Sequence, residues 1–141
     1  MALAAFAGIA ASAHAETTDG IHRLAIQISD ADMAKMNAVL DIAANVSRYY
    51  NERGDEVEIE VVAFGGGVHM LRSDTSPVKE RLIHFMQSMV NVTFQACGNT
   101  LDTMERHEGK RPPLFEGIGT VQTGVARLIE LDEQGWTIVR P

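Results

Sequence analysis

The stretch Asn91–Thr100, which reads Asn-Val-Thr-Phe-Gln-Ala-Cys-Gly-Asn-Thr, contains a predicted strand, a turn and the start of a helix. Residues 92–96 are rich in strand-forming side chains, and Gly98 after them suits a tight turn. Asn99 or Thr100 is suited to cap the helix that follows. The single cysteine, Cys97, falls at the end of the strand. In an open parallel sheet, that end of a strand lies at the crevice where ligands bind.

Cys97 has two interpretations, which its position alone does not separate. A thiol that faces the N-terminus of a following helix lies near the positive end of the helix dipole, which favours the thiolate. Backbone N–H groups of Gly98 and Asn99 would lower its pKa from about 8.5 toward neutrality. The other interpretation is a buried cysteine that acts as a small apolar side chain.

Outward from this stretch, predicted strands and helices alternate along the chain without any hairpin signal. The predicted strands cover residues 22–29, 57–64, 92–96, 119–122 and 136–139, and the predicted helices cover residues 33–53, 77–89, 101–108 and 123–134. Such alternation implies parallel strands joined by right-handed crossovers. We therefore predict an α/β protein, a three-layer α/β/α sandwich around a five-stranded, mainly parallel sheet.

The second predicted strand and the glycines after it form a second segment of interest. Residues 57–64 change from alternating to wholly apolar, which suits a strand at a sheet edge. Gly65, Gly66 and Gly67 follow directly and allow close backbone approach to a ligand. Their spacing is not that of a nucleotide-binding loop, so a flexible turn is the simpler interpretation.

Two helices carry more detailed predictions. Pro77 suits the first position of its helix, with Ser76 as the cap. In the last helix, Val125, Leu128 and Ile129 recur at helical spacing and are predicted to face the core, with Leu131 as a further inward candidate.

The composition is that of one globular domain with an acidic surface. The chain has 141 residues, 45% of them hydrophobic, which is enough for a core. Its 12 Lys and Arg against 19 Asp and Glu give a net charge of −7, and no basic cluster lies among aromatic residues. Nucleic acid is therefore not an expected partner. No apolar run reaches the roughly 18–20 residues that span a bilayer.

Residues 1–15, MALAAFAGIAASAHA, predict a signal peptide with a truncated start. The segment is apolar and uncharged and ends in Ala13-His14-Ala15, a small-x-small cleavage pattern, but it lacks a basic beginning. An Ala-rich terminal helix is the alternative. We expect cleavage before Glu16, a single domain over residues 16–141, and a periplasmic or otherwise exported protein. A single cysteine is unusual in an oxidising compartment, where cysteines are commonly paired.

Three separated blocks resemble the DsrE-like proteins, which are relatives of the sulfur-relay subunit TusD. The blocks are Val61-Val62-Ala63-Phe64-Gly65-x-Gly67 with Val68-His69-Met70-Leu71, then Phe94-Gln95-Ala96-Cys97-Gly98-Asn99-Thr100-Leu101, and then residues 124–131 with Gln134-Gly135-Trp136 and Arg140-Pro141. The resemblance covers residues 21–141. It implies a flavodoxin-like sheet and a homo-oligomer, a trimer or a hexamer.

The resemblance also implies a function and a set of site residues. Sulfur-handling members accept sulfur as a persulfide on a cysteine that aligns with Cys97 and pass it to a partner protein. The residues Gly65, Gly66, Gly67 and His69 align with a loop that faces this cysteine, and Gly98, Asn99 and Thr100 are further binding candidates beside it. No cofactor is implied.

Three functional hypotheses remain open. The first, narrowly favoured, is a sulfur carrier that uses Cys97. The second is a non-catalytic oligomeric module that binds a small ligand or a metal. The third is an assembly protein in which the loop of residues 109–119 forms an oligomer contact. For a metal, His69, Met70, Cys97 and His107 are of suitable types, but no Cys-x-x-Cys or His-x-x-x-His pair is present, so we assign no metal ligands.

Overall fold

The computed structural model describes residues 19–141, and the predicted signal peptide lies outside them. The elements are β1 (His22–Ile28), α1 (Met33–Asn51), β2 (Val57–Ala63), the 3₁₀ helix η1 (Gly65–Leu71), α2 (Lys79–Ser88), β3 (Val92–Cys97), α3 (Gly98–Glu108), β4 (Gly119–Val121), α4 (Gly124–Glu133) and β5 (Thr137–Val139). All five strands form one parallel sheet in the order β4-β3-β2-β1-β5. The α/β prediction is therefore confirmed.

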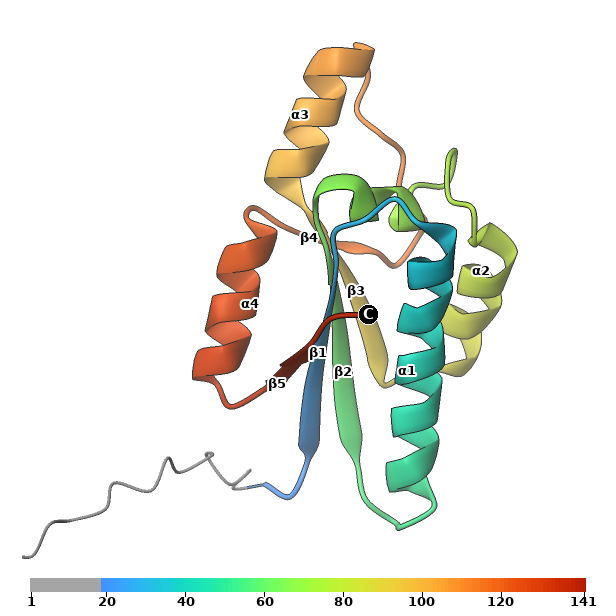
Figure 1. Cartoon of the computed structure of the whole chain (residues 1–141), viewed down its shortest axis with the longest axis vertical. Helices are drawn as coiled ribbons and strands as arrows, with labels where there is room; N and C mark the ends of the chain where they lie inside the picture. Colours follow the sequence, from blue (N-terminus) through green and yellow to red (C-terminus); the bar gives the residue numbers. More distant parts are fainter. Residues whose placement is uncertain (1–18) are drawn as a thin grey trace, which may run out of the picture.

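The sheet lies between two layers of helices (Figure 1). Helices α1 and α2 cover one face, α4 covers the other, and α3 projects past the carboxyl ends of the strands. These layers are those of a flavodoxin-like α/β/α sandwich. Within the described part of the chain, no helix is long and apolar enough to cross a membrane.

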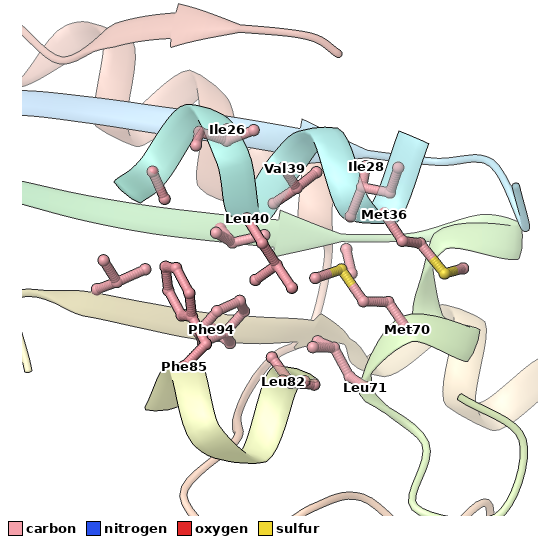
Figure 2. Packing of buried hydrophobic residues seen from close by; sticks show 14 of the residues in the cluster. Ile26, Ile28, Met36, Val39, Leu40, Met70, Leu71, Leu82, Phe85 and Phe94 are labelled. Carbon is pink, nitrogen blue, oxygen red and sulfur yellow. The ribbon is translucent and has the colours of Figure 1, made fainter. Parts of the chain in front are cut away.

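The two faces of the sheet carry cores of very different size. The larger core lies between the sheet and helices α1 and α2 (Figure 2) and includes Ile26, Ile28, Met36, Leu40, Met70, Leu82 and Phe94. The smaller core, under α4, consists of Ala25, Val62, Leu128 and Leu131. Since burial of apolar area supplies most of the folding free energy, the face with α1 and α2 contributes most to stability.

Strand β2 is an interior strand, contrary to the prediction of an edge strand. It pairs with β1 on one side and β3 on the other. Of the two polar residues that suggested a partly exposed strand, Glu58 is exposed, but Glu60 is only 5% exposed. Its carboxylate accepts two hydrogen bonds from the guanidinium of Arg127 on α4, at 2.8 and 2.9 Å. A buried carboxylate thus needs no edge position when a cation from the covering helix reaches it.

Helix α4 packs on the sheet with only part of its predicted face: Leu128 and Leu131 are buried as predicted, but Val125 and Ile129 are not. Gly124, Leu128 and Leu131 point inward, whereas Val125 and Ile129 are 48% and 55% exposed. The inward residues follow the i, i+4, i+7 spacing of a helix that packs along one stripe. Gly124 favours this register because its Cα lies close to Phe64 and Cys97: an added Cβ would lie 3.1 Å from Phe64 Cβ and 3.3 Å from Cys97 Cβ, so a side chain would require these neighbours to shift.

Two turns also differ from their predictions. Helix α2 begins at Lys79, with Pro77 in the preceding turn and Ser76 Oγ accepting a hydrogen bond from the N–H of Val78 at 3.3 Å. The glycine segment is a closely packed 3₁₀ helix rather than a flexible turn. At Gly67 an added Cβ would lie 2.0 Å from the carbonyl oxygen of Ile28, so only glycine fits there.

Candidate functional site

Cys97 lies where the paths of two neighbouring strands diverge. It is the last residue of β3 and the N-cap residue of α3. From β3 the chain continues into α3, beyond the sheet, whereas from the adjacent β4 it enters α4, which runs back along one face (Figure 1). Divergence of this kind between adjacent parallel strands opens the position at which α/β proteins bind their ligands. The structure thus places Cys97 at the carboxyl edge, as predicted.

The sulfur atom of Cys97 contacts the backbone at the start of α4. The N–H of Gly124, the first residue of that helix, donates a hydrogen bond to Sγ at 3.3 Å. As a thiol, Cys97 donates to the carbonyl oxygen of Gln122 at 3.8 Å. Although Cys97 is the N-cap residue of α3, its side chain makes no capping hydrogen bond to that helix. The thiol is therefore bound mainly by the element that follows β4.

This environment lowers the pKa of the Cys97 thiol from its ordinary value. Burial acts in the opposite direction and raises the pKa, because a buried anion loses its hydration. The N–H groups of Gly124, Thr100 and Asn99 and the side chain of Thr100 outweigh burial, because they stabilise the negative charge. The site therefore favours the nucleophilic thiolate form of Cys97.

Exposed polar side chains cover the thiol, which is itself only 5% exposed. The amide of Gln122 donates to Asn99 Oδ1 at 2.6 Å, and the amide of Asn99 donates to Thr123 Oγ1 at 3.0 Å. The backbone N–H of Asn99 also donates to the Gln122 carbonyl oxygen at 2.9 Å. Gly98 lies under Gln122, since an added Cβ would be 3.2 Å from Gln122 Cα. Asn99, Gln122 and Thr123, joined by these hydrogen bonds beside the nearly buried thiol, are called here the polar cover.

Helix α3 is anchored at both of its ends. At its first turn, Thr100 Oγ1 accepts a hydrogen bond from the N–H of Gly65 at 3.0 Å. At its last residue, Glu108 binds the buried guanidinium of Arg72 through two hydrogen bonds of 2.9 Å. The same guanidinium binds Asp74 through two more, at 3.0 and 2.9 Å. These contacts hold both ends of α3, including the first turn next to Cys97.

The structure brings together some of the predicted site residues and separates others. Thr100 acts directly on the Cys97 thiol, and Gly65 is linked to the site through its hydrogen bond to Thr100. Gly98 and Asn99 follow Cys97 in the chain and lie beside the thiol. Gly66 instead packs against Ala31, with an added Cβ 3.0 Å from the Ala31 nitrogen, and Gly67 packs against β1. Both therefore support the loop rather than line the thiol site.

His69 has its hydrogen bond elsewhere: Nδ1 lies 2.8 Å from Thr75 Oγ1. Among residues 19–141, no hydrogen bond or ion pair links His69 to Cys97. The same part of the chain contains no group of three or more His, Cys, Asp or Glu side chains placed to hold a metal ion.

Two large hollows lie away from the thiol. One, of about 540 Å³, includes Ser47 and Asn91, near the amino ends of the strands. The other, of about 1080 Å³, includes His22 and Trp136, beside the start of β1. Neither of these two hollows contains Cys97.

Gly124 and Gln122 supply the main contacts to Sγ, and neither was predicted as a site residue from the sequence. Each lies more than twenty positions from Cys97 in the chain, and the pairing of β3 with β4 brings them together. A weak signal was present, because Thr123-Gly124 marks a helix start directly after a predicted strand, and such starts meet at one edge of a parallel sheet.

No model of a known protein family matches the chain, and no curated protein matches it. Among solved structures, the chain is similar to a protein of unknown function, MTH1491 from Methanobacterium thermoautotrophicum, with a TM-score of 0.71. The two sequences are 29% identical over 85% of this chain and 99% of that chain. This likeness supports the same α/β fold.

Proposed function

We propose that the protein is a DsrE-like sulfur carrier, in which Cys97 accepts a sulfur atom as a persulfide and passes it to a partner protein. The observation that supports this most directly is the hydrogen bond from the N–H of Gly124 to Sγ, at 3.3 Å, on the only cysteine of the chain. A structural cysteine needs no such donor, whereas a nucleophilic thiolate does.

The transfer step balances without an external oxidant. The thiolate of Cys97 attacks the outer sulfur of a donor persulfide, R–S–SH, and its electron pair forms the new S–S bond. The donor S–S bond breaks, and its electron pair leaves on the donor as R–S⁻. Delivery to an acceptor thiolate is the same reaction in reverse, in which Cys97 is the leaving thiolate. In both directions the N–H of Gly124 stabilises charge on Sγ.

The polar cover of Asn99, Gln122 and Thr123 suits a carrier rather than an enzyme with an open pocket. Cys97 is only 5% exposed, so a sulfur atom attached to it would be shielded from water and oxidants, and the side chains beside it are exposed and held only by a few hydrogen bonds at the surface. Docking of a partner would displace these side chains and expose the sulfur. We infer, as parts of the same proposal, a homo-oligomer and export from the cytoplasm.

Intact-protein mass spectrometry tests the proposal. The wild-type protein and Cys97→Ser would be treated with glutathione persulfide and measured before and after dithiothreitol. We expect the wild type to gain one sulfur atom, to lose it on reduction, and to pass it to a small thiol. The variant should gain none. The same spectrum of protein from its native source would locate the N-terminus.

The alternative, a module that binds a small ligand without covalent chemistry, predicts a different result. Cys97 would then stay unmodified under persulfide and resist alkylation in the folded protein. Cys97→Ser would retain the stability of the wild type. That combination would rule out the carrier.

A further inference from the structure

The larger hollow, of about 1080 Å³, opens at the edge of the sheet and is called here the edge groove. It exists because β5 is short: its three residues pair only with Leu24–Ile26, so His22 and Arg23 at the start of β1 pair with β2 but have no strand on their other side. The groove lies between this start of β1, the last turns of α1 and the turn from α4 into β5. It is unconnected with the Cys97 site.

The walls of the edge groove are largely apolar and aromatic. They include Val46, Tyr49 and Tyr50 from α1 and Trp136 and Ile138 from the β5 side. Among residues 19–141, no hydrogen bond engages the indole N–H of Trp136 or the hydroxyl group of either tyrosine. Pockets that bind small molecules have this composition, an apolar surface with a few available polar groups.

The charge at one side of the groove is negative. Asp132 and Glu133 line it at the end of α4, and neither has an ion-pair partner among the described residues. The last turn of α4 contains no basic residue, so the negative end of its helix dipole is not compensated there. Two carboxylates and a helix C-terminus thus act together on whatever occupies the groove.

The one cation that lines the groove does not cancel this charge. Arg23 binds Asp19 and Glu58, so its guanidinium is already paired. A second arginine shows how the aromatic wall can hold a cation: the guanidinium carbon of Arg53 lies 3.4 Å from the centre of the Tyr49 ring. Aromatic faces attract cations through the negative potential above the ring.

We propose that the edge groove binds an organic cation with an apolar body, such as a quaternary or primary ammonium compound. The apolar part would lie against Val46 and Ile138, and the ammonium group between the Trp136 ring and the carboxylates of Asp132 and Glu133. This site is independent of the sulfur-carrier proposal, since it contains neither Cys97 nor any residue that contacts it.

The chain contains its own reporter for the test, because Trp136 is the only tryptophan. Its fluorescence would be followed during titration with three probes of similar size: benzyltrimethylammonium, benzyl alcohol and benzenesulfonate. We expect a saturable change with the cation at roughly millimolar affinity, as is usual for a ligand of this size. The sulfonate should bind at least about tenfold more weakly, and added salt should weaken the cation's binding.

Paired variants separate charge from general effects. Asp132→Asn with Glu133→Gln should remove most of the preference for the cation. The matched control, Glu80→Gln with Glu116→Gln, changes the net charge equally at exposed positions outside the groove and should keep the preference. All four positions are exposed, so both double variants should fold normally.

Three results would overturn the proposal. One is equal binding of the three probes, which would make the groove merely apolar. Another is the same loss of preference in both double variants. The third combines two measurements: none of the probes changes the Trp136 fluorescence, and the protein sediments as an oligomer. That result would show that a second copy covers the groove.

Discussion

Gly124 contributes to the candidate site through the absence of a side chain. Its N–H reaches Sγ of Cys97 because its Cα can approach Phe64 and Cys97 closely. An alanine methyl group would lie 3.1 Å from Phe64 Cβ and 3.3 Å from Cys97 Cβ, closer than neighbouring atoms tolerate without a shift. The backbone at the start of α4 would have to move away from the thiol.

We therefore predict that Gly124→Ala raises the pKa of the Cys97 thiol, because the main hydrogen bond that lowers it is lengthened. The pH dependence of thiolate absorbance in the folded protein measures this directly. A loss of about 1–3 kcal/mol of stability should accompany the change, as is typical for overpacking.

Val125→Ala serves as the control for this experiment. It changes the next residue of the same helix, on its exposed side, and should leave the thiol pKa unchanged. If Gly124→Ala and the control had the same thiol pKa as the wild type, the hydrogen bond to Sγ would not be what lowers it.

Which single residues matter was only partly visible in the sequence. The position of Cys97 at the carboxyl end of a strand was predictable from the sequence, whereas its role stays a prediction. The covering residues Gln122 and Thr123 were not, since their proximity to Cys97 depends on which strand is next to β3. The spacing of apolar residues reveals that a strand is present but not which strand is its neighbour.

Among the elements, helix α4 is joined to the sheet by one ion pair and a small apolar core. Arg127 and Glu60 meet in a two-point contact, with Glu60 buried below the helix. Removal of one partner leaves the other charge in a poorly hydrated position, which costs more than the pair itself contributes.

We predict that Arg127→Leu lowers the free energy of unfolding by about 2–3 kcal/mol, somewhat less than for a fully buried pair because Arg127 is partly exposed. The double variant Glu60→Leu with Arg127→Leu should recover a large part of this loss, since no charge remains unpaired. Urea unfolding of the two single variants and the double variant measures the difference. Additive losses would show that the two side chains do not interact.

Helix α3 depends on a charged contact at its far end, where Arg72 binds Glu108 and Asp74. The hydrogen bonds from Arg72 lower the pKa of Glu108 below its ordinary 4.5 and that of Asp74 below its ordinary 3.8. Groups with a lowered pKa stabilise the fold when ionised, so their contribution is complete above these ordinary values. It is lost as the pH falls through the lower pKa values of the folded state.

We accordingly predict that the wild type loses stability on acidification below about pH 4.5. The double variant Asp74→Asn with Glu108→Gln should be less stable than the wild type near neutral pH and should lose less on acidification. Urea unfolding midpoints at neutral and at acid pH measure the stability of each protein and how much of it is lost on acidification. The variant Glu116→Gln, in an exposed loop, is the control and should follow the wild type. Parallel pH profiles for all three proteins would contradict the prediction.

The helices and strands themselves were largely predictable, because their apolar periods are strong. The faces that the helices turn toward the sheet, and the residues at which the elements begin, were less predictable. The prediction for α4 was wrong at Val125 and Ile129, since apolar spacing allowed two registers and the close approach of Gly124 to Phe64 and Cys97 favours one. The prediction of an edge position for β2 was wrong because a partner for Glu60 lies on a helix 67 residues further along.

Across the sheet, stability should decrease from the centre toward both edges. Strands β1, β2 and β3 are long and carry the main core, whereas β4 and β5 have three residues each and one neighbour each. Local opening takes least free energy where few buried contacts are lost. Strand β4 is also the element from which Gln122 and Gly124 extend over Cys97.

We predict that Cys97 becomes accessible through local opening at β4 rather than through global unfolding. Alkylation of the folded protein should then be slow but nearly independent of low urea concentrations, and hydrogen exchange should be faster in β4 and β5 than in β1 to β3. Mass spectrometry of both reactions tests this. Alkylation that accelerates with urea in step with global unfolding would contradict it.

The overall architecture was more predictable than the site, for a physical reason. Alternation of strands and helices and the handedness of crossovers restrict the fold to a layered parallel sheet. The site depends on side-chain distances of a few ångströms between segments far apart in sequence, and those distances follow only from the completed packing.

The strand order also bears on how the chain is made. The first strand, β1, receives its outer neighbour only from residues Thr137–Val139, which are synthesised after the other four strands. Until then, a nascent chain that already contains β1 to β4 carries an unpaired strand edge, the kind of surface that pairs wrongly with other chains. The delay between synthesis of β1 and of β5 is therefore the interval in which a chaperone would be most useful to this protein.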